Sequence, residues 1–316
     1  MSVIKIHEKG ILAAFASAFF LGLAPIFGKQ AIQFGFSPLI VVAIRTSLAC
    51  LLLFAFLLLF KRQYFYIYPL GLAGCLVAGV INGIGSILYY SALARLDAGI
   101  GQLLYSFYPL FMVFWLLLDR QSVSRVTVFR LALVFPGVFL LINNARQGVD
   151  YVGAIFMLVA AALYALHLLI NQRVLYEIPA PTVTFYTLVA MSVTVVIAFL
   201  LINPALPDPG VPWWPLLILA LITFFSRITL FLGVKHLGGM QTTLLGLGEL
   251  LVTVIVAQLY LGEHLTLLQW VGVLLICLNL VLVIFDKPTS RKRSGRGFLY
   301  WLNPPLVNPT DSPFQE

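Results

Sequence analysis

Apolar runs of about 20 residues, repeated along the whole chain, constrain its possible folds more than any other feature. In a bilayer every backbone N–H and C=O must be hydrogen-bonded within the protein, so only helices and closed barrels can span it. The runs are continuous rather than alternating, which favours helices over barrel strands. Charged residues make up 9% of the chain, whereas soluble proteins typically carry about 25%. The sequence therefore predicts an all-α membrane protein.

We expect ten transmembrane helices joined by short loops rich in glycine and proline. Residues 1–10 form a cytoplasmic N-terminus, and the first run is too long for a cleaved signal peptide. Residues 286–316 form a basic, Pro-rich cytoplasmic tail, more typical of a stop-transfer anchor with a flexible end than of a partner-binding segment. The predicted spans are 11–30, 38–60, 68–92, 98–118, 124–143, 151–171, 181–203, 212–234, 239–261 and 266–285.

Lysine and arginine gather in the loops on one side of the predicted bundle. Cytoplasmic loops carry an excess of both residues, so both termini are predicted to be cytoplasmic, in a cell (inner or plasma) membrane. The net charge of +8 then reflects loops that face an anionic leaflet rather than a nucleic-acid partner. The outer loops carry only Arg95 and Arg146; the inner side carries Lys5, Lys9, Lys61, Arg62, Arg120, Arg125, Arg173, Lys235, Lys287, Arg291, Lys292, Arg293 and Arg296.

The two halves of the chain show weak internal similarity. Residues 90–99 align with residues 231–240 at an offset of 141, and Pro38 aligns with Pro181 at an offset of 143. Residues 11–143 and 151–285 would then each hold five spans. An odd number of spans forces the second half into the opposite orientation, which gives two inverted five-helix repeats. This architecture is typical of transporters whose site lies near the midplane between the halves.

Several local motifs are distributed over both halves of the chain. The first half carries Gly22, Lys29, Ser37, Pro38, Arg45, residues 90–96 and Pro109, and the second carries Glu249 and residues 261–266. With these motifs, residues of about 11 to 285 resemble the EamA-type branch of the drug/metabolite transporter superfamily. The chain has Leu21 before Gly22 where the family usually has Trp, Leu250 after Glu249 where Pro is frequent, and residues 119–121 where Leu-Gly-Glu is typical. The resemblance implies transport of small organic metabolites or drugs without ATP.

Glu249 and Arg227 are the most informative charged residues, because a charge at the centre of a membrane helix costs about 2.5–3.5 kcal/mol on insertion scales. Both lie at similar depth, roughly 15 Å from the turn that joins their helices. They could form a structural ion pair, or Glu249 could line a cavity and bind an amine or a proton while Arg227 tunes its ionisation. The face formed by Thr242, Gly246, Glu249 and Thr253 slightly favours the cavity.

Other polar and aromatic residues are predicted to lie at the same depth. Tyr108 and Ser86 are the repeat equivalents of Glu249 and Arg227. Tyr105, Tyr108, Met112 and Trp115 form an aromatic stripe, more often packing than recognition, that would suit a planar substrate. Arg45 could bind a carboxylate or only carbonyls, and His167 could carry a proton or be a hydrogen-bonded interior residue. The candidate substrate-binding residues are Glu249, Arg227, Tyr108, Tyr105, Asn82, Ser86, Tyr89, Arg45, His167 and Trp115.

The sequence contains none of the common catalytic motifs HExxH, GxxxxGK[ST], GxSxG or GxGxxG. Cys50, Cys75 and Cys277 lie in apolar runs without metal-ligand spacing, so neither a metal nor another cofactor is expected. The predicted function is secondary transport by rocking of the two halves around a midplane cavity. The expected substrates are small, zwitterionic or aromatic metabolites such as amino acids, and protons are a candidate coupling ion. The alternative is a polytopic membrane enzyme or sensor that does not transport; the oligomeric state stays open.

Overall fold

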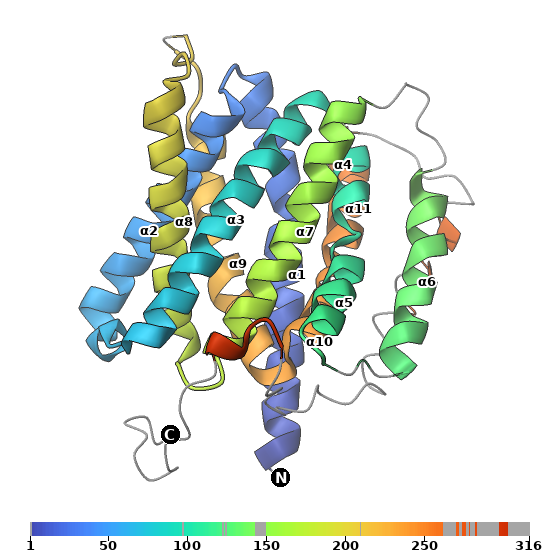
Figure 1. The fold of residues 1–316 in the computed structure, drawn as a ribbon. Coiled ribbons are helices and arrows are strands. Elements are labelled where there is room, and N and C mark those ends of the chain that lie inside the picture. Colours follow the sequence, from blue (N-terminus) through green and yellow to red (C-terminus); the bar gives the residue numbers. More distant parts are fainter. Residues whose placement is uncertain are drawn as a thin grey trace.

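The computed structural model describes residues 2–96, 98–121, 123, 125–142, 150–208, 210–261 and 297–302, together with a few residues between 270 and 282. These residues form helices and no strand (Figure 1). The helices are α1 (Ser2–Gln33), α2 (Pro38–Phe60), η1 (Arg62–Phe65), α3 (Pro69–Arg95), α4 (Ala98–Tyr105), α5 (Tyr108–Leu118), α6 (Arg125–Ile142), α7 (Tyr151–Val174), α8 (Ala180–Ile202), α9 (Trp214–Leu237), α10 (Gly239–Gly246), α11 (Gly248–Leu261) and η3 (Tyr300–Leu302).

The prediction of an all-α membrane protein is confirmed. Six helices are long and apolar enough to cross a membrane, namely α1, α2, α3, α7, α8 and α9. Helix α1 begins at Ser2, so most of the segment expected before the first span is helical as well. The predicted tenth span, 266–285, lies almost entirely outside the described residues, and the total of ten stays a prediction.

Local sequence signals fix where these helices begin. Pro38 opens α2, and the side chain of the preceding Ser37 accepts a hydrogen bond from the backbone N–H of Ile40 at 3.3 Å. Proline suits a first turn because the N–H that it lacks would have no helical partner there. Asp150 caps α7 by accepting from the N–H groups of Val152 and Gly153 at 2.8 and 3.0 Å. These bonds, that of Gly153 foremost, hold the pKa of the Asp150 carboxyl below its usual value.

Two of the expected spans are interrupted near their middle. Residues 98–118 form α4 and α5 with a break at Ser106 and Phe107, and residues 239–261 form α10 and α11 with a break at Leu247. Pro109 lacks the N–H that would bond the carbonyl of Tyr105, which explains the first break. The second lies between Gly246 and Gly248, residues that weaken a helix. Ser106 plus the repeat offset of 141 is position 247, so the breaks are equivalent.

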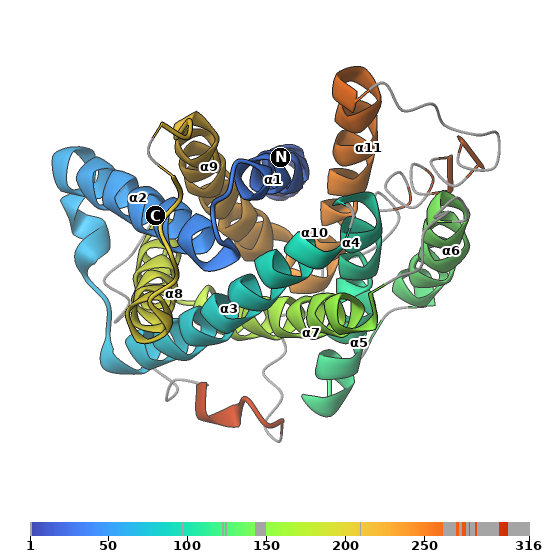
Figure 2. The same cartoon turned by 90° about the horizontal axis from the view of Figure 1, so that it is seen from above.

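Among the described helices, contacts between the two halves of the chain are more extensive than contacts within either half. Helix α1 packs along α9, α3 packs along α7 and α8, and α2 packs on α8 and α9 (Figure 2). A two-fold operation that carries the first half onto the second takes α1 to α7 and α3 to α9. It therefore exchanges the α1–α9 pair with the α7–α3 pair, and these are the two most extensive helix contacts. The packing is that expected of an internal repeat.

The orientation of α1 and α7 shows that the repeat is inverted. Lys29, near the end of α1, donates from Nζ to the carbonyls of Leu93 and Leu96 at the end of α3, both at 2.8 Å. Helix α7 begins at this same end of the bundle, because its cap Asp150 pairs with Arg95 at 3.3 Å. The first helix of one half therefore ends where the first helix of the other begins (Figure 1).

Residues 297–302 of the predicted tail pack at the opposite end, where α1 begins (Figure 1). Leu299 and Leu302 are buried in the main hydrophobic core. The expectation of a flexible end is wrong for this part of the tail, because two leucines find buried positions there. Residues 303–316 lie outside the described residues.

Close packing between α3 and α8 predicts an unusual effect of adding one methyl group. A Cβ at Gly79 would lie 2.5 Å from both Ala190 Cβ and the carbonyl oxygen of Thr187. Gly→Ala in an exposed helix normally stabilises by about 1 kcal/mol, but here overpacking should destabilise by about 1–3 kcal/mol. We expect Gly79→Ala to lower the melting temperature of the purified protein in detergent.

Val80→Ile is the matched control, because it adds one carbon at the next position of α3, where the side chain is exposed. Its melting temperature should stay at the wild-type value. Equal melting temperatures for both variants would show that α3 and α8 are not in close contact.

Candidate functional site

A cavity lies between helices of both halves, close to the two helix breaks. Helix α3 contributes more lining residues than any other helix, α1, α2 and α4 complete the wall on the side of the first half, and α7, α9 and α11 close it from the second half. The lining residues are Leu21, Ala24, Arg45, Asn82, Gly85, Ser86, Tyr89, Tyr90, Gln102, Tyr105, Ala160, Tyr164, Arg227 and Glu249. Seven of the ten candidate residues are among them: Glu249, Arg227, Tyr105, Asn82, Ser86, Tyr89 and Arg45.

The cavity is small in this conformation, with a volume of about 60 Å³. That is room for a few water molecules, since a cavity needs at least about 10–15 Å³ to hold one water. An engineered apolar cavity that holds benzene measures about 150 Å³. A metabolite with an aromatic ring would therefore fit only after the surrounding helices have moved apart.

Glu249 supplies the negative charge of the cavity. It is the second residue of α11, directly after the helix break, and its side chain is buried. The side-chain amide of Gln102 on α4 hydrogen-bonds the carboxylate. The Oε1 atom of Glu249 is buried without a hydrogen-bond partner. An acceptor left unpaired in this way costs about 1–3 kcal/mol, more when charged, and an amine or a proton would relieve that cost.

Gln102 in turn connects Glu249 to α3. Its Oε1 accepts a hydrogen bond from the hydroxyl of Tyr89 at 2.9 Å. Because Oε1 is occupied as an acceptor, the Nε2 group is the donor to the carboxylate. Tyr89, Gln102 and Glu249 thus form a chain of hydrogen bonds along one side of the cavity.

Arg45 supplies one of two positive charges. Its Nη1 donates to Thr223 Oγ1 at 3.1 Å and its Nη2 to Ser86 Oγ at 3.2 Å, while Nε is buried without a partner. The guanidinium lies 4.7 Å from the centre of the Tyr90 ring, within cation–π range. Neutral groups hold this charge in place, and no carboxylate among the described residues compensates it.

Arg227 supplies the second positive charge and is likewise held by neutral partners. With its amide oxygen turned toward Arg227, Asn82 accepts from Nη1 and Nη2, both at 3.1 Å. His167 Nδ1 lies 2.6 Å from the carbonyl of Tyr164. A carbonyl only accepts, so Nδ1 carries the hydrogen and Nε2 is free to accept from Arg227 Nη1, 3.5 Å away. His167 thus lies behind Arg227 and acts on the cavity through it.

The structural ion pair between Arg227 and Glu249 is not formed in this conformation. In the part of the chain that the structure describes, ion pairs join Arg95 to Asp150 and Arg173 to Asp119. Two guanidinium groups and one carboxylate therefore face a common cavity without neutralising one another. Each buried, unpaired charge costs several kcal/mol, so a ligand with complementary charges would be strongly favoured there.

Tyrosine rings form the remaining wall. Tyr105 lies at the centre of this group, with ring centres 4.8 Å from Tyr89, 5.6 Å from Tyr108 and 5.4 Å from Tyr164. Tyr108 stands behind the lining, where its hydroxyl donates to the carbonyl of Thr243 at 3.0 Å. The ring group is large, rigid and partly polar, which suits contact with a planar ligand.

Trp115 lies away from the cavity, because the helix break between α4 and α5 interrupts the predicted stripe. Its Nε1 donates to the carbonyl of Ala162 at 3.0 Å, and its ring lies 6.3 Å from that of Phe298. Met112, also in the stripe, is buried in the core. The stripe predicted on one continuous helix therefore divides into a cavity portion and a packing portion.

Two contacts beside the cavity are repeat equivalents of each other. Gln102 and Tyr108 of the first half correspond to Thr243 and Glu249 of the second at the offset of 141. Tyr108 bonds the carbonyl of Thr243, and Glu249 bonds the side chain of Gln102. The same pair of positions thus meets twice, once with neutral chemistry and once with a carboxylate.

Three polar or aromatic residues of the cavity were not predicted from the sequence, namely Gln102, Tyr90 and Tyr164. Gln102 precedes Tyr105 by one helical turn, which was the available signal that it shares the face of that tyrosine. Tyr164 shares a helix face with His167, but nothing in the sequence shows that this face meets α4. These residues join the site through contacts between helices distant in sequence.

Comparison with known proteins gives the family of the chain. The model of the EamA-like transporter family matches twice, at residues 8–143 and 151–285. The chain is 24% identical over 221 residues to the uncharacterized transporter YcbK of Bacillus subtilis, covering 66% of this chain and 70% of that protein. It is 27% identical over 222 residues to the uncharacterized transporter sll1319 of Synechocystis, covering 66% of each.

A crystal structure with 15% sequence identity has the same fold, with a TM-score of 0.70 over 87% of this chain and 98% of the other. The family model covers most of the chain, in two copies that coincide with its two halves. The long apolar helices agree with a multi-pass membrane protein. The chain therefore belongs to the EamA-like transporter family and is a multi-pass membrane transporter.

Proposed function

We propose that this transporter moves small zwitterionic metabolites, such as amino acids, by secondary transport through the cavity beside Glu249. The observation that carries the proposal is a buried cavity that holds charges of both signs without an ion pair between them. An amine bound at Glu249 Oε1 and a carboxylate bound at Arg45 or Arg227 would compensate both signs together. The guanidinium fork is suited to a carboxylate, and the tyrosine rings would contact an apolar or aromatic side chain.

We propose protons as the coupling ion, with Glu249 as their carrier. A buried carboxylate with a free oxygen is an energetically favourable place for a proton when no substrate amine is present. Proton and amine would then compete for the same oxygen. Such competition couples the two fluxes without ATP.

Alternating access in this fold would depend on the interrupted helices more than on the sequence halves as rigid bodies. A rigid rocking of one half against the other would break the α1–α9 and α3–α7 contacts, which are the most extensive in the bundle. The two breaks, one between α4 and α5 and one between α10 and α11, lie beside the cavity. The short helices can therefore turn there while the long helices stay paired. Family membership favours this transporter over a membrane enzyme or sensor.

A matched set of ligands tests the zwitterion. We expect one or more amino acids from a standard panel to raise the melting temperature of the purified protein, since a ligand at 100 times its Kd stabilises by about 2.7 kcal/mol. The corresponding amine without the carboxyl, and the corresponding acid without the amine, should stabilise far less, because each leaves one charge unpaired. Equal stabilisation by either analogue would contradict a zwitterion site, as would no stabilisation by any amino acid.

Glu249→Gln tests the role of the carboxylate in transport. The substitution keeps the size of the side chain but removes its charge, and a charge-assisted hydrogen bond is worth about 1.5–3 kcal/mol. Uptake of the stabilising amino acid into proteoliposomes should fall by about 10- to 100-fold, with normal accumulation in the membrane. Glu8→Gln, an exposed position near the start of α1, is the matched control. Wild-type uptake by Glu249→Gln would assign Glu249 a structural role.

Gln102→Met tests whether Gln102 holds Glu249 in place. The change leaves the Tyr89 hydroxyl and the Glu249 carboxylate each short of one partner, which should destabilise the protein by about 1–3 kcal/mol. Leu104→Met, a volume-conserving change at a half-buried position on the same helix, should cost less. Thermal unfolding in detergent measures both, and equal melting temperatures would show that Gln102 is not needed as a bridge.

A further inference from the structure

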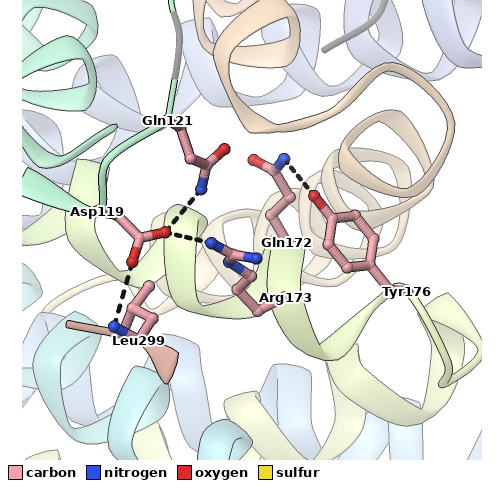
Figure 3. A network of polar contacts seen from close by, with 6 residues as sticks. All are labelled: Asp119, Gln121, Gln172, Arg173, Tyr176 and Leu299. Atoms are coloured by element: carbon pink, nitrogen blue, oxygen red, sulfur yellow. Dashed lines mark hydrogen bonds and ion pairs between the residues drawn. The ribbon is translucent and has the colours of Figure 1, made fainter. Parts of the chain in front are cut away.

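Residues 297–302 cover a buried ion pair between the two halves of the chain (Figure 3). Asp119 directly follows α5 in the first half, and Arg173 lies in the last turn of α7 in the second half. Their side chains form an ion pair and are 0% and 2% exposed. The pair therefore fastens α5 to α7 at the end of the bundle where α1 begins.

The tail segment contacts this pair directly. The backbone N–H of Leu299 donates to Asp119 Oδ1 at 3.2 Å. A Cβ at Gly297 would overlap the same oxygen, so glycine is required for this close approach. Leu302 is buried against α3 and α7, where a Cβ at Gly74 would lie 2.8 Å from Leu302 Cδ2. The segment thus spans helices of both halves and excludes water from the ion pair.

A neighbouring contact fastens α10 at the same end. Gln172 Oε1 accepts from the backbone N–H of Gly239, the first residue of α10, at 2.9 Å, and its Nε2 donates to the Tyr176 hydroxyl at 3.1 Å. Two consecutive residues of α7, Gln172 and Arg173, therefore hold both interrupted spans. Figure 3 shows them side by side with Asp119 and Leu299.

The opposite end of the bundle is closed more weakly. There Arg95 and Asp150 also join the two halves, at 3.3 Å, but their side chains are 50% and 36% exposed. Water and salt screen such a pair, whereas a pair shielded from water interacts strongly. The two ends thus differ in whether water reaches the ion pair that closes them.

We propose that residues 297–302 act as a strap that locks the end of the bundle where α1 begins, and that the cavity opens toward this end only after the strap has left Asp119. Release of the strap admits water to the Asp119–Arg173 pair and weakens it. Helices α5 and α10 are then free to turn at their breaks. The cytoplasmic tail would in this way control one of the two steps of alternating access. This role of the strap depends on the proposed function in one respect only, namely that the cavity is the transport path.

Thiol labelling of the cavity tests the strap without a substrate. The full-length protein would carry Ala160→Cys, at a cavity-lining position, with Cys50, Cys75 and Cys277 replaced by alanine. A membrane-impermeant maleimide is applied to sealed vesicles of either orientation, and an N-terminal tag identifies the side that carries the start of α1. Gly297→Ala should raise the labelling rate from that side by about fivefold, the population change expected from loss of one average hydrogen bond. Labelling from the other side should not increase.

Trp301→Ala is the matched control, because it removes an exposed ring from the same segment and should leave both rates unchanged. Leu302→Ala, which removes a buried contact of the strap, should act like Gly297→Ala and replaces it if that variant fails to accumulate. Unchanged rates in both strap variants would overturn the proposal. Faster labelling in Asp119→Asn, with unchanged rates in both strap variants, would show that the ion pair locks the bundle without the strap. Neither result decides whether substrate passes through the cavity, which uptake into proteoliposomes measures separately.

Discussion

Backbone hydrogen bonding inside each helix is the constraint on which the rest of this structure depends. The bilayer offers no water to an unpaired N–H or C=O, so a spanning helix is interrupted only where protein or a cavity surrounds the break. The breaks at Ser106–Phe107 and at Leu247 meet that condition, because they flank the cavity and lie inside the bundle. They bring Tyr105 and Glu249 to it from helix ends rather than from helix middles.

The charged residues of the cavity follow from the same constraint. A guanidinium or carboxylate on the lipid face would meet hydrocarbon, but at the junction of the halves it meets hydroxyls, amides and aromatic faces. Arg45 binds Thr223 and Ser86, and Arg227 binds Asn82. These neutral partners lower the cost of burial without cancelling the charge. The charges therefore stay available to a ligand, which an ion pair between Arg227 and Glu249 would have prevented.

Most of the fold was predictable from the sequence, because a spanning helix requires a long apolar run and because Pro38 and Pro181 lie in the first turns of equivalent helices. The charged cavity residues were predictable as well, since a charge at midspan is costly wherever it lies. Gln102 was not, because its importance comes from Tyr89 and Glu249 on two other elements. Trp115 was misplaced because a continuous helix was assumed through Pro109. The packing of Leu299 and Leu302 could not be read from a tail whose composition is that of a solvated segment.

The equivalent contacts of Tyr108 with Thr243 and of Glu249 with Gln102 have a consequence for how a fused duplicate can work. A dimer of identical five-helix chains would place the same residue at both positions, so a dipolar solute could lie in it either way round with equal energy. Joining the two copies in one chain removes that degeneracy. One position is a carboxylate and the other is a phenol, which gives the centre of the protein a fixed electrical polarity. A solute with separated charges would then keep one orientation with respect to the protein throughout its passage.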